Sequence, residues 1–265
     1  MASFLPFKIV IIGAGGVATN IGRLLSGNGI KVTQILGRSA ASTRQLADKL
    51  QCRYILDPQQ LDQSADLYII AVQDREIVPL LTRIKVPENA VVVHTAGGVS
   101  LDIFKGHFSK YGVLYPLQSL RKETIEVPEI PFYLDANAAR TKDFLEDFSK
   151  QARLDYRWAD DGQRMQLHVA AVFCSNFPNY LYSLAEKFCN DNQLAFASLL
   201  PIIEETASRL KREATSPAWL QTGPAIRGDI ATTDKHLQLL EKDKEAFSVY
   251  QLLTGKIMHS RLLGK

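Results

Sequence analysis

The sequence predicts an α/β domain with a mostly parallel sheet, followed by an all-helical domain. Up to about residue 159, short runs rich in Val and Ile alternate with amphipathic stretches, the pattern of strands joined by crossover helices. After Asp160 the alternation stops and long stretches of helical period follow. We therefore expect a first domain over residues 1–159 and a second over residues 160–265.

The individual elements follow from the same periods. Strands are expected at residues 8–12, 31–36, 54–55, 67–72, 91–94, 112–115, 132–134 and 154–158, with helices at 16–26, 41–50, 77–84 and 138–151. In the second domain, helices are expected at residues 162–190, 194–214 and 232–262, with a loop at 216–229. Asp160 and Asp161 are placed to cap the first of these helices and to complement its dipole.

The composition limits the class of protein. Of the 265 residues, 46% are hydrophobic and 22% charged, and the 31 Lys and Arg are scattered among 28 Asp and Glu. No basic block predicts nucleic-acid binding, and no apolar run approaches the ~18 residues of a membrane span. The apolar N-terminal stretch continues directly into a glycine turn, unlike a signal peptide. We expect a cytoplasmic protein without nucleic-acid or membrane partners.

No metal site is expected. The three cysteines, Cys52, Cys174 and Cys189, form no C-x-x-C pair and are expected to be reduced and buried. The five histidines show no metal-binding spacing, so a zinc site would need ligands from distant segments.

A glycine-rich turn follows the first predicted strand and opens the first helix, in the pattern G-x-G-x-x-A. Gly13 permits a tight turn, Gly15 lets the backbone approach a pyrophosphate, and Ala18 lets the helix lie close to the sheet. This context predicts a Rossmann-type dinucleotide-binding domain, the alternative being a tight turn without a ligand. The cofactor-binding residues expected here are Gly13, Ala14, Gly15, Gly16, Val17 and Ala18.

The end of the second strand favours NADP over NAD. An NAD site usually has Asp or Glu here to bind the ribose 2′-hydroxyl, whereas this sequence has Arg38 and Ser39. Arg38 could bind a 2′-phosphate and Ser39 could donate its hydroxyl, at about 1.5–3 kcal/mol for a charge-assisted hydrogen bond. The alternative is a solvated Arg in a loop.

Two further strand ends are expected to line the nicotinamide half of the site, because ligands bind outside the carboxyl ends of parallel strands. They carry Val72 and Gln73, and Thr95 and Ala96. The neighbouring His94 is interpreted as a strand-end histidine with satisfied hydrogen bonds.

Three segments, residues 115–120, 168–177 and 222–229, resemble a bacterial family of NADP oxidoreductases that join a Rossmann-like domain to a helical domain of unknown function. That family is related to pyrroline-5-carboxylate reductase and the 6-phosphogluconate dehydrogenase-like superfamily. The resemblance covers nearly the whole chain and implies an NADP cofactor and a homodimer through the helical domain, but no substrate. The family usually has His at the start of the first segment, where this chain has Tyr115, so that position is assigned no catalytic role.

Candidate catalytic residues lie on the helix expected at residues 162–190. His168 and Ser175 share one face at helical spacing, with Asn176 at its edge. Histidine can act as a general acid toward a carbonyl or imine that accepts hydride, because its ordinary pKa lies near ~6.5. A structural histidine in the domain interface is the alternative. Pro178 should interrupt this helix and free the carbonyl of Cys174.

The loop at residues 221–229 resembles the pyrroline-5-carboxylate reductase loop that approaches the partner's nicotinamide and substrate. The resemblance implies that Thr222 binds substrate and that Arg227 holds a carboxylate, in the same or the partner subunit. The alternative is an Arg227–Asp229 ion pair, with Asp229 capping the next helix.

The sequence thus predicts an NADP-dependent oxidoreductase that transfers hydride between nicotinamide and a small carbonyl or imine substrate in a cleft between the domains. Related hydroxyacid dehydrogenases present Lys and, one turn later, Asn, where this chain has His168 and Val172. That difference gives some weight to the alternative, a non-catalytic NADP(H)-responsive binding protein.

Overall fold

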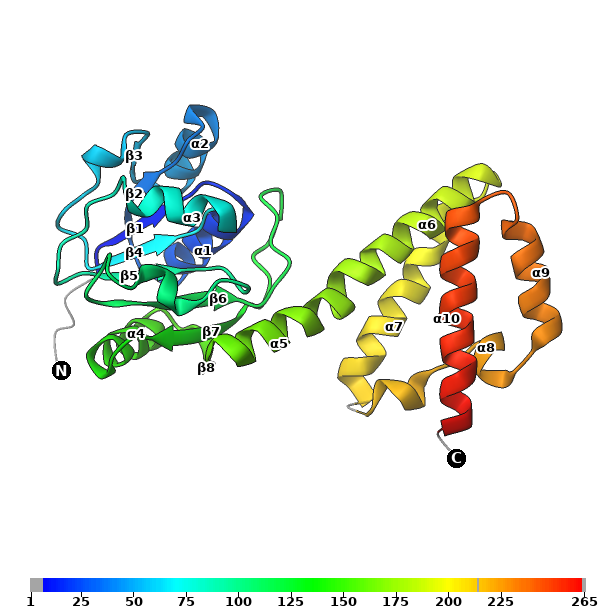
Figure 1. Ribbon diagram of the computed structural model, residues 1–265. Coiled ribbons are helices and arrows are strands. Elements are labelled where there is room, and N and C mark those ends of the chain that lie inside the picture. The colour runs from blue at the N-terminus through cyan, green and yellow to red at the C-terminus, as the bar shows by residue number, and fades with distance from the viewer. Residues whose placement is uncertain (1–6, 214, 264–265) are drawn as a thin grey trace. The chain divides into compact units, whose positions relative to one another are not determined.

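The computed structural model describes residues 7–213 and 215–263, which belong to two compact units (Figure 1). The first unit is Met1–Phe177 and the second is Pro178–Lys265, and each is described by itself. Helix α5 (Asp161–Ala171) follows the last strand and belongs to the first unit. The division therefore falls one helix later than the end of the sheet.

Within the described residues of the first unit, eight strands form one sheet in the order β3-β2-β1-β4-β5-β6-β7-β8. Neighbouring strands are parallel except β6 and β7, which are antiparallel, so the predicted α/β class with a mostly parallel sheet is confirmed. The strands are β1 (Ile9–Ile12), β2 (Val32–Leu36), β3 (Arg53–Ile55), β4 (Leu67–Ile70), β5 (Val91–His94), β6 (Tyr111–Pro116), β7 (Pro131–Ala136) and β8 (Asp155–Trp158).

Both faces of this sheet are covered, which explains its uninterrupted apolar strands. Helices α1 (Gly16–Gly27), α2 (Ala40–Leu50) and α4 (Ala139–Gln151) pack on one face, and α3 (Asp74–Leu81) packs on the other with short 3₁₀ turns at Pro58–Gln60 and Leu101–Phe104. In β1, Ile9 and Ile11 enter one hydrophobic cluster, whereas Val10 and Ile12 enter the other. Helix α3 begins three residues earlier than the sequence predicts, at Asp74.

The strand order reverses at β1, and this reversal positions the functional site. β2 and β3 lie on one side of β1, whereas β4, β5 and β6 lie on the other. Successive crossovers therefore leave the carboxyl ends of β1 and β4 in opposite directions and open a crevice there.

The second unit is helical, as predicted. Its elements are α6 (Phe177–Asp191), α7 (Leu200–Glu213), α8 (Pro224–Arg227), α9 (Ile230–Leu240) and α10 (Lys244–Leu263), with 3₁₀ turns at Phe196–Leu199 and Pro217–Leu220. The single helix predicted at residues 232–262 is wrong, because α9 ends at Leu240 and the Asp243 carboxylate accepts a hydrogen bond from the Ala246 N–H to start α10. The helix predicted at 194–214 begins only at Leu200, and residue 214 lies outside the described residues.

Where the sequence predicts one helix at residues 162–190, the chain forms α5, then a π-helical turn at Val172–Asn176, then α6. Asp160 and Gln163 form a reciprocal capping box at the start of α5, with hydrogen bonds of 2.8 and 3.1 Å. Pro178 has no N–H to continue the regular ladder, and the widened turn directly precedes it. The 3.6-residue repeat that aligned Ser175 with His168 does not apply through a π turn.

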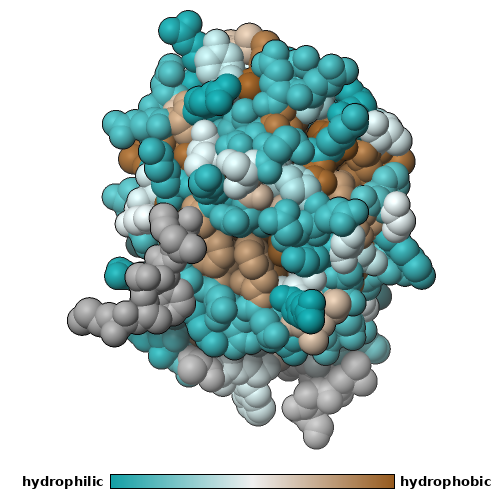
Figure 2. Space-filling model, turned by 90° about the vertical axis from the view of Figure 1, so that its left-hand side faces the viewer, coloured by the Kyte–Doolittle hydropathy of each residue, from teal (hydrophilic) through white to brown (hydrophobic). Residues whose placement is uncertain are grey.

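The surface of the first unit is largely hydrophilic in the view of Figure 2, with hydrophobic residues exposed in limited patches. Among residues 7–213 and 215–263, no helix combines the length and apolarity that crossing a membrane requires. The same residues contain no cluster of His, Cys, Asp and Glu suited to a metal ion. The prediction that all three cysteines are buried is wrong, because Cys174 is exposed and Cys52 is half-buried.

Candidate functional site

A cleft of about 300 Å³ opens where β1, β2 and β4 end. Its lining includes a majority of the predicted cofactor-binding residues, namely Gly13, Ala14, Gly15, Arg38, Ser39, Val72 and Gln73. It also includes polar residues that sequence reasoning missed, namely Ser42, Glu76, Arg83 and Lys122. The strand-end rule could find the first group, whereas the second reaches the cleft from helices and a distant loop.

The glycine turn leaves room for a phosphate at the start of α1. Gly13 has φ +128, and a Cβ there would lie 2.1 Å from the Ala71 carbonyl oxygen, so only glycine fits this turn. At Gly15 a Cβ would meet no described atom within 4 Å, so packing does not require a glycine there. No described side chain caps α1, which leaves its first N–H groups available to an anion. These features fit a bound pyrophosphate.

Three of the predicted turn residues do not line the cleft but pack α1 against its surroundings. Gly16 packs against the carbonyl of Leu120, where a Cβ would come within 2.3 Å. Val17 is half-buried against the sheet, and Ala18 is fully buried between α1 and the sheet. Ala18 thus permits the close approach of helix and sheet that the sequence pattern predicts.

The ribose end of the cleft carries one positive and one negative side chain, Arg38 and Glu76. Nη1 of Arg38 lies 3.0 Å from Oε2 of Glu76, with the Arg38 side chain 75% exposed, so this arginine is ion-paired at the surface. Ser39 is the N-cap of α2, where its hydroxyl oxygen accepts a 3.5 Å hydrogen bond from the Ser42 N–H. Both side chains border open space that could hold a phosphate.

The structure pairs His168 with Tyr115, a residue to which sequence reasoning gave no role. Nδ1 of His168 lies 3.0 Å from the Tyr115 hydroxyl, 53 positions away in the chain. His168 is exposed, whereas Tyr115 is buried, and burial raises the pKa of its phenol despite the opposing charge of Arg164. A neutral phenol can donate a hydrogen bond to Nδ1 or accept one from it, so the hydrogen bond can form whether the histidine is neutral or protonated.

The lack of a side chain at Gly97, in the loop after β5, makes room for this pair. A Cβ at Gly97 would lie 2.7 Å from the Tyr115 ring and 3.0 Å from Nδ1 of His168. Any larger residue would therefore displace the pair. Thr95 and Ala96 precede Gly97 in this loop, but both are buried, and neither lines the cleft.

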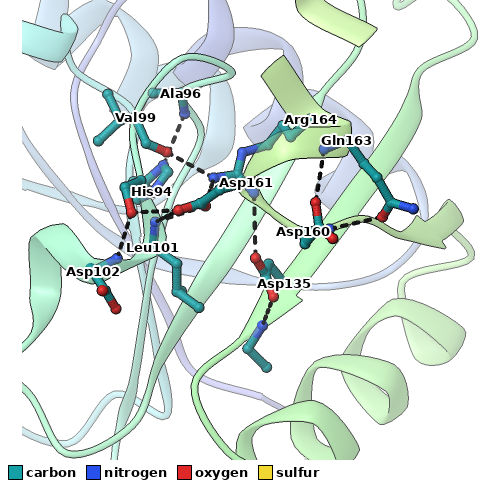
Figure 3. A network of polar contacts seen from close by, with 12 residues as sticks. His94, Ala96, Val99, Leu101, Asp102, Asp135, Asp160, Asp161, Gln163 and Arg164 are labelled. Carbon is teal, nitrogen blue, oxygen red and sulfur yellow. Dashed lines mark hydrogen bonds and ion pairs between the residues drawn. The ribbon is translucent and has the colours of Figure 1, made fainter. Parts of the chain in front are cut away.

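A buried cation ties the first turn of α5 to the sheet (Figure 3). Arg164 is 1% exposed, its Nη2 donates to the Val99 carbonyl at 2.8 Å and to the Asp161 carboxylate, and Nη1 lies 3.5 Å from the Asp135 carboxylate. Asp161 in turn accepts from the Ser100 hydroxyl and the Leu101 N–H. This network fixes the helix on which His168 lies, one turn after Arg164.

The two carboxylates of this network differ in their proton affinity. Burial raises the pKa of Asp135, although the Ala136 N–H and Arg164 oppose the shift. Burial also acts on Asp161, but hydrogen bonds from Ser100, Leu101 and Arg164 outweigh it and lower its pKa. Asp161 is therefore the more firmly ionised partner of Arg164.

His94 lies next to this network and is fully buried. Its Nδ1 accepts a 3.2 Å hydrogen bond from the Ala96 N–H, which leaves the proton on Nε2, and that atom has no hydrogen-bond partner among the described residues. Burial, with the charge of Arg164, lowers its pKa to about 4. The strand-end histidine expected from the sequence is thus neutral and half-satisfied.

Comparison with known families identifies both parts of the chain. A family described as NADP oxidoreductase coenzyme F420-dependent matches residues 8–98, and a domain of unknown function, DUF2520, matches residues 130–257. The crystal structure of a putative NADP oxidoreductase from Bacteroides fragilis shares 36% identity and a TM-score of 0.89, covering 96% of this chain and 98% of that chain. The chain belongs to this NADP oxidoreductase family. It is an NAD(P)-dependent oxidoreductase, as the sequence predicts.

More distant solved structures share the fold. A 1-pyrroline-5-carboxylate reductase from Streptococcus pyogenes has 19% identity and a TM-score of 0.63, covering 96% of this chain and 99% of that chain. A reductive aminase from Aspergillus terreus, solved with NADPH and ethyl-5-oxohexanoate, has 13% identity and a TM-score of 0.67, covering 98% of this chain and 95% of that chain. No curated protein matches the sequence.

The other predicted catalytic residues of the oxidoreductase lie on the π turn and in the second unit. Ser175 is half-buried and Asn176 is exposed, both within the π turn. Thr222 and Arg227 are exposed in the second unit, Arg227 at the end of α8. Asp229 caps α9 through a 3.1 Å hydrogen bond from the Thr232 N–H, as the alternative interpretation of this loop expects.

Replacing Arg164 by Met should destabilise the enzyme by about 3–5 kcal/mol, because two carboxylates would lose a buried partner. The matched control is Arg157→Met, which removes an exposed pair at 3.1 Å from Asp155 and should cost at most about 1 kcal/mol. Urea unfolding measures both variants. Equal losses would contradict the anchoring role of Arg164.

Acid should destabilise the fold through His94. An unfolded histidine binds a proton near its ordinary value of 6.5, whereas folded His94 does so only near a pKa of about 4. The unfolded state therefore binds more protons in this window, and about 2 kcal/mol of stability should be lost between about pH 7 and about pH 5. Chemical unfolding at both pH values should show a smaller loss for His94→Asn than for the wild type. An unchanged difference would show that His94 does not titrate as described.

Proposed function

We propose that this oxidoreductase uses NADP to reduce a small carbonyl or imine compound, and that His168 supplies the proton. The observation that carries the proposal is the His168–Tyr115 pair, held at 3.0 Å beside the loop after β5. This loop and the cofactor cleft occupy neighbouring strand ends of the same compact unit.

The cofactor preference is argued from the end of β2. Arg38 and Ser39 occupy the position where an NAD site usually has an acid, and both line the cleft. The nearby Glu76 is ion-paired with Arg38 at 3.0 Å, so a phosphate would compete with it for the guanidinium. The reductive aminase of similar fold was solved with NADPH, which supports the same choice.

The need for a separate proton donor follows from the charge balance of the reduction. NADPH supplies a hydride when bound, so the reduced carbon gains an electron pair and its oxygen or nitrogen needs a proton from elsewhere. His168 is exposed and its Nε2 has no hydrogen-bond partner among residues 7–213 and 215–263, so this nitrogen is available to donate. Tyr115 is the positioning residue, since its bond to Nδ1 orients the imidazole.

The remaining site residues are assigned to substrate. Ser175 and Asn176 lie on the turn that follows the helix of His168. Thr222 and Arg227 would bind a hydroxyl or carboxylate of the substrate, from the same or the partner subunit. A catalytic cleft between the domains, a cytoplasmic location and the absence of nucleic-acid partners stay predictions.

Substituting His168 should abolish most turnover while leaving cofactor binding intact. His168→Asn should lower kcat by about 10²–10⁴-fold, and Tyr115→Phe by a smaller factor, because they remove the proton donor and its orienting bond. NADPH oxidation is measured across a panel of imines, keto acids and aldehydes, with the exposed His107→Asn as control. NADP⁺ binding is measured by calorimetry on the same proteins.

Two outcomes would contradict the proposal. Turnover that survives His168→Asn would exclude the histidine as proton donor. Tight NADP⁺ binding with no turnover of any panel member would instead support the non-catalytic, NADP-responsive protein.

We also propose that the enzyme is a homodimer through its helical unit. Few described residues of that unit are buried, and large apolar side chains such as Ile202, Trp219 and Leu239 are 65%, 82% and 68% exposed. An apolar groove of about 580 Å³ lies among α6, α9 and α10. A helical unit of this size needs a further apolar surface to complete its core, and a second copy supplies one.

Leu253→Glu should weaken this dimer, because Leu253 lines the groove and is 40% exposed. Sedimentation should show the wild type as a dimer and the variant with a dissociation constant raised about tenfold or more, as burying an unpaired charge predicts. Val78→Glu, at a 57% exposed residue of α3, is the matched control and should stay dimeric. A monomeric wild type would reject the assignment.

A further inference from the structure

The loop that joins β6 to β7 is hydrogen-bonded to α1. We call residues 117–130, which join β6 to β7, the β6–β7 strap. Asn20 is fully buried, and its Nδ2 donates to the carbonyls of Gly16 at 2.9 Å and Arg121 at 2.8 Å. The Leu120 carbonyl fills the space that a side chain at Gly16 would need. The strap is thus packed on the first turns of the helix that begins the cofactor site.

A second anchor follows immediately. Arg23 of α1 donates from Nη1 to the Thr124 carbonyl and from Nη2 to the Ile125 carbonyl, both at 2.6 Å. The Thr124 hydroxyl donates back to the Arg121 carbonyl at 2.9 Å. Lys122 lies between these fastened positions, so its backbone is fixed before any ligand arrives.

The side chain of Lys122 borders the ribose end of the cleft. It lines the cleft together with Arg38, Ser39 and Ser42, and it lines a neighbouring hollow that Ser42 also borders. Lys122 is half-buried. Its ammonium has no ion pair or hydrogen bond among residues 7–213 and 215–263.

Charge balance at this end of the cleft calls for another cation. The Arg38 guanidinium is paired with Glu76 at 3.0 Å, and Arg75, which does not line the cleft, lies 3.8 Å from the same carboxylate, so these three groups carry a net charge of only +1. A phosphomonoester carries about −1.5 to −2 charges near neutral pH. Of the other cations that line the cleft, Arg83 lies just after α3, and only Lys122 shares the second hollow with Ser42.

We propose that Lys122 is a cofactor-specificity residue that binds the 2′-phosphate of NADP, together with Arg38 and Ser39. This inference rests on the proposed function in one respect, the preference for NADP over NAD. It assigns part of that preference to the β6–β7 strap, which is far from the end of β2 in sequence. A rule that considers only the ends of strands does not find this residue.

The test compares two cofactors that differ only in the 2′-phosphate. Calorimetry of the full chain with NADP⁺ and NAD⁺ should show that Lys122→Met weakens NADP⁺ binding about tenfold or more, since a charge-assisted hydrogen bond is lost. NAD⁺ affinity should change by less than about twofold. Adenosine 2′,5′-bisphosphate and adenosine 5′-monophosphate, used as smaller probes, should show the same contrast.

Matched variants distinguish a direct contact of Lys122 with the phosphate from a long-range electrostatic effect of any nearby cation. Lys49→Met removes a cation that borders the neighbouring hollow but not the cleft, and it should leave both affinities within about twofold. Lys122→Arg keeps the charge and should retain most of the preference for NADP⁺. Arg83→Met tests the other unassigned cation of the cleft.

The outcomes are distinguishable. Equal losses of NADP⁺ and NAD⁺ affinity in Lys122→Met would place the ammonium on the pyrophosphate and overturn the inference, as would no loss, or an equal effect of Lys49→Met. If only Arg83→Met lowered the preference, the inference would also fail. A wild type that binds NADP⁺ no better than NAD⁺ would overturn both this inference and the proposed cofactor.

Discussion

The buried guanidinium of Arg164 is the interaction on which the catalytic half of the site depends. It joins α5 to the loop after β5 through the Val99 carbonyl and to β7 through Asp135. An arginine that is 1% exposed is tolerated only because two carboxylates and a carbonyl surround it. Without that anchor, the first turn of α5 would keep only the hydrogen bonds of Asp161 with Ser100 and Leu101 to hold His168 near Tyr115.

The cofactor half depends on backbone geometry instead of charge. Gly13 turns the chain beside the Ala71 carbonyl, and the reversal of strand order at β1 leaves the crevice open in front of it. The polar side chains then enter from three separate places, the end of β2, the start of α3 and the β6–β7 strap. Arg38, Glu76 and Lys122 therefore line one cleft although none is close to another in sequence, and their charges must be considered together.

Sequence reasoning located the elements well where the signal was local. The glycine turn, the strand ends and the Asp160 cap depend on residues within one turn or one strand, and the structure reproduces them. It failed where a helix departs from its ideal repeat: the π turn before Pro178 upset the face shared by His168 and Ser175, and Asp243 restarts a helix that the apolar period runs through. A repeat of 3.6 residues assumes a regular helix, and Pro178 and Asp243 mark the places where the helix is not regular.

The sequence by itself determined the fold class, the family and the position of the dinucleotide turn, because strand periods and glycine conformations are properties of neighbouring residues. Only the tertiary structure decided which side chains act together. Tyr115 and His168 are 53 positions apart, and Arg23 reaches the strap across 101 positions. Such pairs form only after the whole sheet has set its register, and no local pattern of residues encodes them.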